Sequence, residues 1–215
     1  MKMNYFYRAL VALLLTTTAC NTQNNKDVIT TEKSNIVAEQ CVVLHDSAMS
    51  LLNKYYFEDT NPTKLDLILD LLNQAIACDT NYFLAYNDKV TVLSIKGEYM
   101  KVVSLLNKML EFSGNDPQLI FLKGIAYEKL NNYSAAETAY KKAAIEYEKR
   151  LNLYPDSIEM ILDKLFFIAF TKGKGEALSE LNKYILKYPD NTMFQDYKPM
   201  FENFNRDDFM IQHEK

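Results

Sequence analysis

The chain has 215 residues, of which 48% are hydrophobic and 24% are charged, and its formal net charge is -4. This length suits one domain or one short repeat array. The acidic balance and the absence of a lysine- or arginine-rich cluster leave no electrostatic footprint for nucleic acid or for an anionic membrane surface, so both are discounted as direct partners of the folded domain.

Residues 1–19 predict an export signal. Lys2 and Arg8 precede an apolar run over residues 9–15, and the small residue Ala19 follows it. This run is too short to span a bilayer, but its length and its flanks are what the secretion machinery requires. Cleavage after Ala19 removes both basic residues and makes the net charge two units more negative.

Cys20 follows directly after Thr18 and Ala19. This arrangement resembles the lipobox of bacterial lipoproteins, with Thr17 where that motif usually carries leucine. The resemblance implies that Cys20 is lipidated, becomes the mature N-terminus and holds the exported protein at a membrane of the bacterial cell envelope. In enteric lipoproteins an aspartate after the cysteine retains the protein in the inner membrane, so Asn21 favours the outer membrane.

A polar tether is expected over residues 20–35, between the lipid and the folded domain. Residues 21–35 contain only two aliphatic side chains, which are too few to bury a core. As a flexible coil this segment spans roughly 20 Å, enough to lift a small domain clear of the lipid headgroups.

Helical periodicity dominates the chain after residue 35 and predicts an all-α fold. In the first segment apolar side chains recur every three or four residues, at Val37, Cys41, Leu44, Ala48, Leu51 and Tyr55. That spacing lines one face of a helix. A polar loop over residues 57–62 ends the segment, and a second amphipathic segment runs to Ile76. The short connection predicts that these two helices pack antiparallel.

A repeat is visible in the turns at residues 97–99 and 131–133, which lie 34 residues apart and both end in tyrosine. Thirty-four residues is the tetratricopeptide period. The clearest unit carries Ile120, Lys123, Gly124 and Tyr127 on its first helix and Ala136, Tyr140 and Ala143 on its second. This pattern resembles the signature of the tetratricopeptide repeat (TPR) family, whose helix hairpins stack into a right-handed α–α superhelix.

The resemblance implies a repeat domain over residues 36–206. Its predicted parts are repeats over 36–82, 83–116, 117–156 and 157–191, a capping helix over 192–204, and a frayed tail over 207–215. The cap is expected because an open array leaves an apolar face at each end. In the third repeat the small residues Gly124, Ala136 and Ala143 are expected to let the paired helices approach closely, while Tyr127 and Tyr140 fill the wedge between repeats.

The resemblance also implies a binding groove, because the first helix of each TPR repeat lines an exposed surface. Transferring that surface to this chain selects Asn87, Thr91, Phe121, Ile125, Glu128, Met160, Asp163, Phe167 and Phe170. An apolar groove with scattered acids favours an extended or helical peptide that carries hydrophobic anchors and some basic charge. The alternative is that some of these phenylalanines fill space under an unusually long second helix in the third repeat, predicted from Ser134 to about Leu153.

Residues suited to catalysis or to metal binding are sparse, and no cofactor is expected. The two histidines, His45 and His213, cannot form a three-histidine site and do not match the HExxH spacing. Cys41 and His45 lie four residues apart on one predicted helix, so they could share a face as a thiol and its base, or as half of a metal site. The favoured interpretation is that Cys41 continues the apolar stripe and His45 sits at its edge, facing water.

A disulfide between Cys41 and Cys78 is a further possibility, because export places both residues in an oxidising compartment. Cys41 lies near the start of the first predicted helix and Cys78 at the end of the second, so antiparallel packing brings these ends together. A disulfide and two unpaired buried thiols both stay open at this point. A bridge closing this loop would stabilise the fold by roughly 3 to 4 kcal/mol.

These observations favour a non-enzymatic, lipid-anchored adaptor or scaffold that binds a protein or peptide partner in the cell envelope. An inhibitor or immunity-type protein that occupies one envelope enzyme or toxin is the second interpretation. A tight one-to-one complex that abolishes a defined activity would distinguish it from a scaffold, which holds two or more partners. A catalytic function comes third and depends only on Cys41 and His45.

Overall fold

The computed structural model describes residues 37–58 and 60–211, and these residues contain ten α-helices and no β-strand. The helices are α2 (Glu39–Phe57), α3 (Thr63–Cys78), α4 (Phe83–Ile95), α5 (Tyr99–Ser113), α6 (Pro117–Lys129), α7 (Tyr133–Leu153), α8 (Ile158–Lys172), α9 (Lys174–Lys187), α10 (Thr192–Asn203) and α11 (Arg206–Ile211). The fold is therefore all-α, as predicted. The expected export signal (residues 1–19), Cys20 and the tether (residues 20–35) lie outside the described residues. None of the described helices has the length and apolarity needed to cross a membrane.

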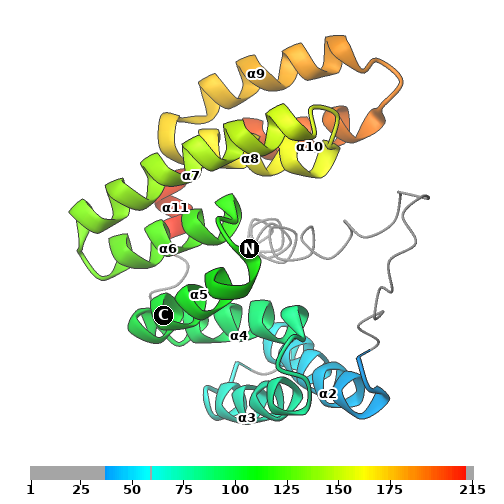
Figure 1. Ribbon diagram of the computed structural model, residues 1–215, viewed down its shortest axis with the longest axis vertical. Helices are drawn as coiled ribbons and strands as arrows, with labels where there is room; N and C mark the ends of the chain where they lie inside the picture. The colour runs from blue at the N-terminus through cyan, green and yellow to red at the C-terminus, as the bar shows by residue number, and fades with distance from the viewer. Residues whose placement is uncertain (1–36, 59, 212–215) are drawn as a thin grey trace.

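Successive helices pack against one another along the chain (Figure 1). Each of the four predicted repeats holds one helix pair, α2–α3, α4–α5, α6–α7 and α8–α9. In Figure 1 these pairs follow one another from α2–α3 at the bottom to α8–α9 at the top. The long second helix predicted for the third repeat is α7, with 21 residues.

The two turns that lie 34 residues apart share one backbone geometry. Gly97 and Asn131 both adopt positive φ, at 71° and 57°. The next amide in each turn reaches back five residues, from Glu98 to the Leu93 carbonyl and from Asn132 to the Tyr127 carbonyl, both at 2.9 Å. These bonds match the Schellman motif that ends a helix on a left-handed residue. The sequence repeat is thus also a repeat of backbone hydrogen bonding.

The start of α6 is fixed by Asp116, which is 6% exposed. Its Oδ1 accepts hydrogen bonds from the backbone amides of Gln118 and Leu119 at 2.9 and 3.2 Å, and Pro117 occupies the first helical position. Both features are typical of a strong helix start. The second oxygen, Oδ2, accepts from Arg150 of α7 at 2.9 Å. The cap therefore also ties the beginning of α6 to the end of α7.

The buried side chains form two hydrophobic cores that meet at α6. The N-terminal core comes from α2 to α5 and includes Leu119 and Ala126 of α6. The C-terminal core comes from the other apolar face of α6 and from α7 to α11. Leu110 and Leu122 pack against both cores. Helix α6, with Leu110 of α5, therefore joins the two halves of the molecule.

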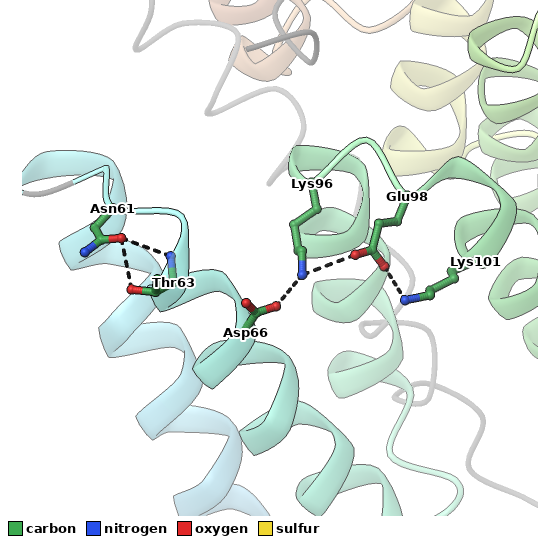
Figure 2. Close-up of polar contacts among 6 residues, drawn as sticks. All are labelled: Asn61, Thr63, Asp66, Lys96, Glu98 and Lys101. Atoms are coloured by element: carbon green, nitrogen blue, oxygen red, sulfur yellow. Dashed lines mark hydrogen bonds and ion pairs between the residues drawn. The ribbon is translucent and has the colours of Figure 1, made fainter.

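A chain of ionic contacts ties the pair α2–α3 to the turn between α4 and α5 (Figure 2). Lys96 at the end of α4 contacts Asp66 in the first turn of α3 and Glu98 at 3.2 Å, and Lys101 of α5 contacts Glu98 at 2.7 Å. In the loop before α3, Asn61 Oδ1 accepts from the backbone amide and the hydroxyl of Thr63 at 3.0 and 2.9 Å. These contacts lie at the loop end of the α2–α3 pair.

The C-terminal end differs from the prediction. Helix α10 lies within the predicted cap and buries Phe194, Met200 and Phe201 against α8 and α9. The tail expected to fray from residue 207 instead forms α11, up to Ile211. Phe209 explains the difference, because it is only 4% exposed and packs into the C-terminal core. A helix of six residues is too short to show an apolar period in the sequence.

Candidate protein-binding surface

Helix α11 lies on a surface built by three other helices, which we call the α11 seat. The seat consists of Glu128 and Lys129 in the last turn of α6, Tyr140 of α7, and Phe166 and Phe170 of α8. Phe166 and Phe170 are four residues apart and therefore share one face of α8. Figure 1 shows α11, in red, beside α6 and α7.

The base of the seat is a cluster of aromatic rings around Phe121. The Phe121 ring centroid lies 6.0 Å from that of Phe166, 5.2 Å from Phe170 and 5.9 Å from Tyr140. The ring plane of Phe121 is inclined at 65° to that of Phe166 and at 75° to that of Phe170. Aromatic pairs prefer such near edge-on arrangements. Phe121 is fully buried, so it supports the seat from below.

One part of the seat is apolar and holds Phe209 of α11. The Phe209 ring lies 5.7 Å from Phe166 and 5.6 Å from Phe170. Phe204, just before α11, closes the same site at 5.3 Å from Phe166. Burial of a phenylalanine side chain stabilises a fold by about 1.5 to 3 kcal/mol. We call this part the phenyl subsite.

The other part binds the guanidinium group of Arg206. Its Nη2 pairs with Glu128 Oε1, and its Cζ lies 4.5 Å from the centroid of Phe170. The group therefore combines an ion pair with a cation–π contact. The Arg206 side chain is 38% exposed and that of Glu128 15%, so the ion pair contributes up to about 1 kcal/mol. We call this part the guanidinium subsite.

Tyr140 fixes Glu128 in that subsite. The hydroxyl of Tyr140 donates a hydrogen bond to Glu128 Oε2 at 2.8 Å. Burial, reinforced by the hydrogen bond and charge of Glu128, raises the pKa of Tyr140 well above its ordinary value. The hydroxyl therefore stays protonated and remains a donor, which leaves Oε1 of Glu128 directed to Arg206.

The ends of α11 match the charges around them. Asn205 Oδ1 accepts from the Asp207 amide at 2.9 Å, and Asp207 and Asp208 lie in the first turn. At the other end Lys129 Nζ contacts the carbonyl oxygen of Met210. Acids near the N-terminus and a cation near the C-terminus both stabilise a helix. A peptide of six residues is not a stable helix in water, so these contacts hold α11 in place.

A pocket of about 810 Å³ opens beside α11, along residues 202–206 and Asp208. Its wall includes Glu137 and Lys141 of α7, Lys174 of α9, and Glu202. Charges of both signs line it, so it favours a mixed polar chain over a ligand of uniform charge. The chain therefore has open space next to the segment that occupies the seat.

The nine residues predicted for the groove do not form one open surface. Six of them are at most 8% exposed: Asn87, Thr91, Phe121, Ile125, Phe167 and Phe170. Glu128, Met160 and Asp163 are partly exposed. The prediction that the first six face solvent is wrong, because neighbouring helices cover them and α11 covers Phe170. The alternative interpretation holds for Phe167, whose ring lies 5.4 Å from Tyr147 on the long helix α7.

Sequence reasoning placed Glu128 and Phe170 on the binding face, and both belong to the α11 seat. It missed Arg206 and Phe209, which were assigned to the end of the domain and to a frayed tail. One signal could have found them, since Asn205 with acids two and three residues later is typical of a helix start.

His45 and Cys41 do not form a catalytic pair. Cys41 is joined to Cys78 in a disulfide with a Cα–Cα distance of 5.5 Å, so it has no free thiol. His45 is buried, at 8% exposed, and its Nε2 lies 2.6 Å from Asp88 Oδ2. The expectation that His45 faces water is wrong, because Asp88 on α4 pairs with it.

The environment of His45 shifts its pKa. Burial on its own lowers the value, but the hydrogen bond and charge of Asp88, together with the charge of Asp46, outweigh burial and raise the pKa above 6.5. Within residues 37–58 and 60–211, no group of three or more His, Cys, Asp or Glu side chains is arranged to hold a metal ion.

The fold and the surface define an all-α chain of consecutive helix pairs with a short helix seated on its C-terminal half. No protein-family model matches the sequence, and no curated protein matches it.

Proposed function

We propose that this protein is a lipid-anchored, TPR-like adaptor of the bacterial cell envelope that binds a protein partner and catalyses no reaction. The α11 seat is the observation that carries this proposal. It combines a phenyl subsite and a guanidinium subsite on rigid helices, and it already holds a short helical segment. A surface of this kind is suited to helix recognition through spaced anchor side chains.

The TPR-like part of the proposal is supported by local geometry in the third repeat. A Cβ built on Gly124 would lie 2.4 Å from Cε1 of Tyr140. No side chain fits there without displacing the ring, so α6 and α7 pack closely at this point, and this close approach supports the TPR-like interpretation. The matching turns at Gly97 and Asn131 support the 34-residue repeat. Together they favour stacked TPR-like hairpins in a right-handed superhelix.

The proposed location in the cell envelope depends on the sequence of the first 21 residues. The basic and apolar pattern before Ala19 and the position of Cys20 support export and lipidation. Asn21 supports an outer-membrane location. A lipid on Cys20 and a polar tether would keep the helical domain close to the membrane and available to other envelope proteins.

The proposal is tested by photo-crosslinking in intact cells. A photoreactive amino acid replaces Thr171, which is exposed and lies in the wall of the pocket beside α11. The matched control replaces Met100, which is 69% exposed and lies on α5. We expect Thr171 to capture one or two envelope proteins that Met100 does not capture, and the Cys20→Ala variant to lose both the membrane fraction and the capture. A protein in the soluble fraction with no specific partner would contradict the proposal.

A further inference from the structure

We propose that α11 is an internal substitute for the partner, and that the partner presents a short helix with an arginine and a phenylalanine three residues apart. This inference rests on the proposed function, and it assigns the binding site and the chemistry of the partner. The partner helix takes the α11 seat by displacing α11.

The side chains of α11 define what the seat recognises. Arg206 and Phe209 lie three positions apart in the sequence, so they share one face of a helix. Arg206 enters the guanidinium subsite and Phe209 the phenyl subsite. A partner that reproduces both contacts needs the same spacing on a helix.

Arginine suits the guanidinium subsite better than lysine. The carboxylate of Glu128 lies on one side of the Arg206 group, and the ring of Phe170 lies against it at 4.5 Å. A planar guanidinium makes both contacts at once, whereas an ammonium group keeps the charge and loses the planar stacking on the ring. The partner is therefore expected to be selective for arginine.

Lys129 sets the direction of the bound helix. Its ammonium group contacts the carbonyl of Met210 at the C-terminal end of α11. Carbonyl groups at a helix end carry partial negative charge. A partner helix in the seat thus directs its C-terminal end to Lys129 of α6.

Few contacts attach α11, so we expect that a partner helix can displace it. Phe209 is the only buried residue in the helix, and the Arg206 side chain is 38% exposed. The helix is six residues long and follows α10 through only Phe204 and Asn205. The pocket of about 810 Å³ alongside leaves room for an occupant larger than α11. A longer helix with the same two anchors would gain contacts that α11 does not make.

The test uses a fluorescent peptide with the sequence of residues 203–211 and the purified full chain. Phe209→Ala removes the phenyl anchor of α11 and opens the seat, while Ile211→Ala changes a residue that is 56% exposed and serves as the matched control. We expect the peptide to bind Phe209→Ala at least tenfold more tightly than it binds the wild type or Ile211→Ala, because the attached α11 competes in the last two. Adding Glu128→Gln to Phe209→Ala should weaken binding again. A peptide in which the phenylalanine at the position of Phe209 is replaced by alanine should not bind.

A second variant keeps the test valid if Phe209→Ala fails to fold. Arg206→Ala leaves Phe209 in the core and releases only the guanidinium contact. If Phe209→Ala loses its helical circular dichroism, Arg206→Ala is expected to show the increase in peptide affinity in its place. Equal affinity for the wild type and both variants, or no binding to any of them, would overturn the inference.

Four outcomes distinguish between this inference, the proposed function and a second copy of the chain as the occupant. Peptide competition against the protein captured at Thr171 supports both. Capture that the peptide does not reduce overturns the inference and leaves the adaptor function standing. Peptide binding without any captured envelope protein supports the seat and overturns the adaptor function. A dimer in which two wild-type chains exchange their α11 helices, detected by size-exclusion chromatography with light scattering, would show that a second copy of the chain occupies the seat. This result would overturn the proposal of a separate partner protein.

Discussion

The N-terminal and C-terminal cores are stabilised by different kinds of contact. The N-terminal half has a chain of ionic contacts at the loop end of the α2–α3 pair (Figure 2). It also has a disulfide at the other end of that pair and a partly buried pair between His45 and Asp88. The C-terminal half contains no cysteine, since all three cysteines lie at or before residue 78. It has ion pairs as well, between Asp116 and Arg150 and between Glu128 and Arg206, but its core consists largely of packed aromatic rings around Phe121.

This difference has a consequence for binding. A covalent bond and ion pairs fix particular atoms to one another, so they hold the N-terminal pair in one arrangement. Aromatic contacts depend on area and on ring orientation, so another phenylalanine can satisfy them equally well. The half with exchangeable contacts is the half that carries the α11 seat. The N-terminal half is then expected to supply rigidity, and the C-terminal half to supply recognition.

The largest expected effect comes from the centre of the aromatic cluster. Phe121→Ala removes contacts to Tyr140, Phe166 and Phe170 and leaves a cavity, so the free energy of unfolding should fall by about 3 to 5 kcal/mol. Urea denaturation measures the change. Phe57→Ala is the control, because that ring is 64% exposed. Equal losses in the two variants would mean that the ring cluster does not stabilise the C-terminal half.

Removal of the disulfide tests the other half. In the double variant Cys41→Ala/Cys78→Ala the unfolded chain gains the entropy of a loop closed over 37 residues, so stability should fall by about 3 to 4 kcal/mol. Hydrogen exchange should increase in α2 and α3 while α6 to α9 stay protected. Exchange that increases uniformly over both halves would contradict the separation of the two cores.

Gly124→Ala tests the close approach of α6 and α7. The new methyl group would meet the Tyr140 ring, and we expect a loss of about 1 to 3 kcal/mol from overpacking. Gly175→Ala on α9 is the matched control, since no atom lies within 4 Å of a Cβ there, and it should be neutral or slightly stabilising. Thermal unfolding compares the two. A loss at Gly175 as large as that at Gly124 would argue against close helix contact as the cause.

The smallest expected effect is the pH dependence contributed by His45. Its pKa in the folded state is raised above 6.5 by Asp88 and Asp46 against the opposing effect of burial. The stabilisation is therefore complete below the unfolded-state pKa and is lost as the pH rises through the folded-state pKa. The stability difference between the wild type and His45→Gln should decrease between pH 6 and pH 8. Parallel pH profiles would exclude a contribution from His45 protonation.

Much of the helical architecture could be predicted because it depends on local pattern. The apolar spacing from Val37 to Tyr55 predicted the first helix, and the long α7 was predicted from Ser134 to about Leu153. The approach of Cys41 to Cys78 follows from antiparallel packing, although the sequence left their redox state open. These features depend on contacts between neighbours in the chain.

The exposure of the candidate site could not be predicted because it depends on contacts between distant residues. Glu128 and Arg206 are 78 positions apart, and His45 and Asp88 are 43 apart. No periodic pattern indicates either pair. Phe170 was expected to be open, and it is buried because a six-residue helix covers it. The sequence therefore predicted that Glu128 and Phe170 belong to one binding face, but not that α11 covers Phe170.

The central claim is that a partner replaces α11 on its seat, and photo-crosslinking from Thr171 in intact cells tests it most directly. The capture is compared in the wild type, in Phe209→Ala and in the control Ile211→Ala, at equal protein levels. The account predicts that Phe209→Ala captures several times more of the same envelope protein than the other two, and that adding Glu128→Gln reverses the increase. Equal capture in all of them would show that α11 does not compete with the partner, and would contradict the account.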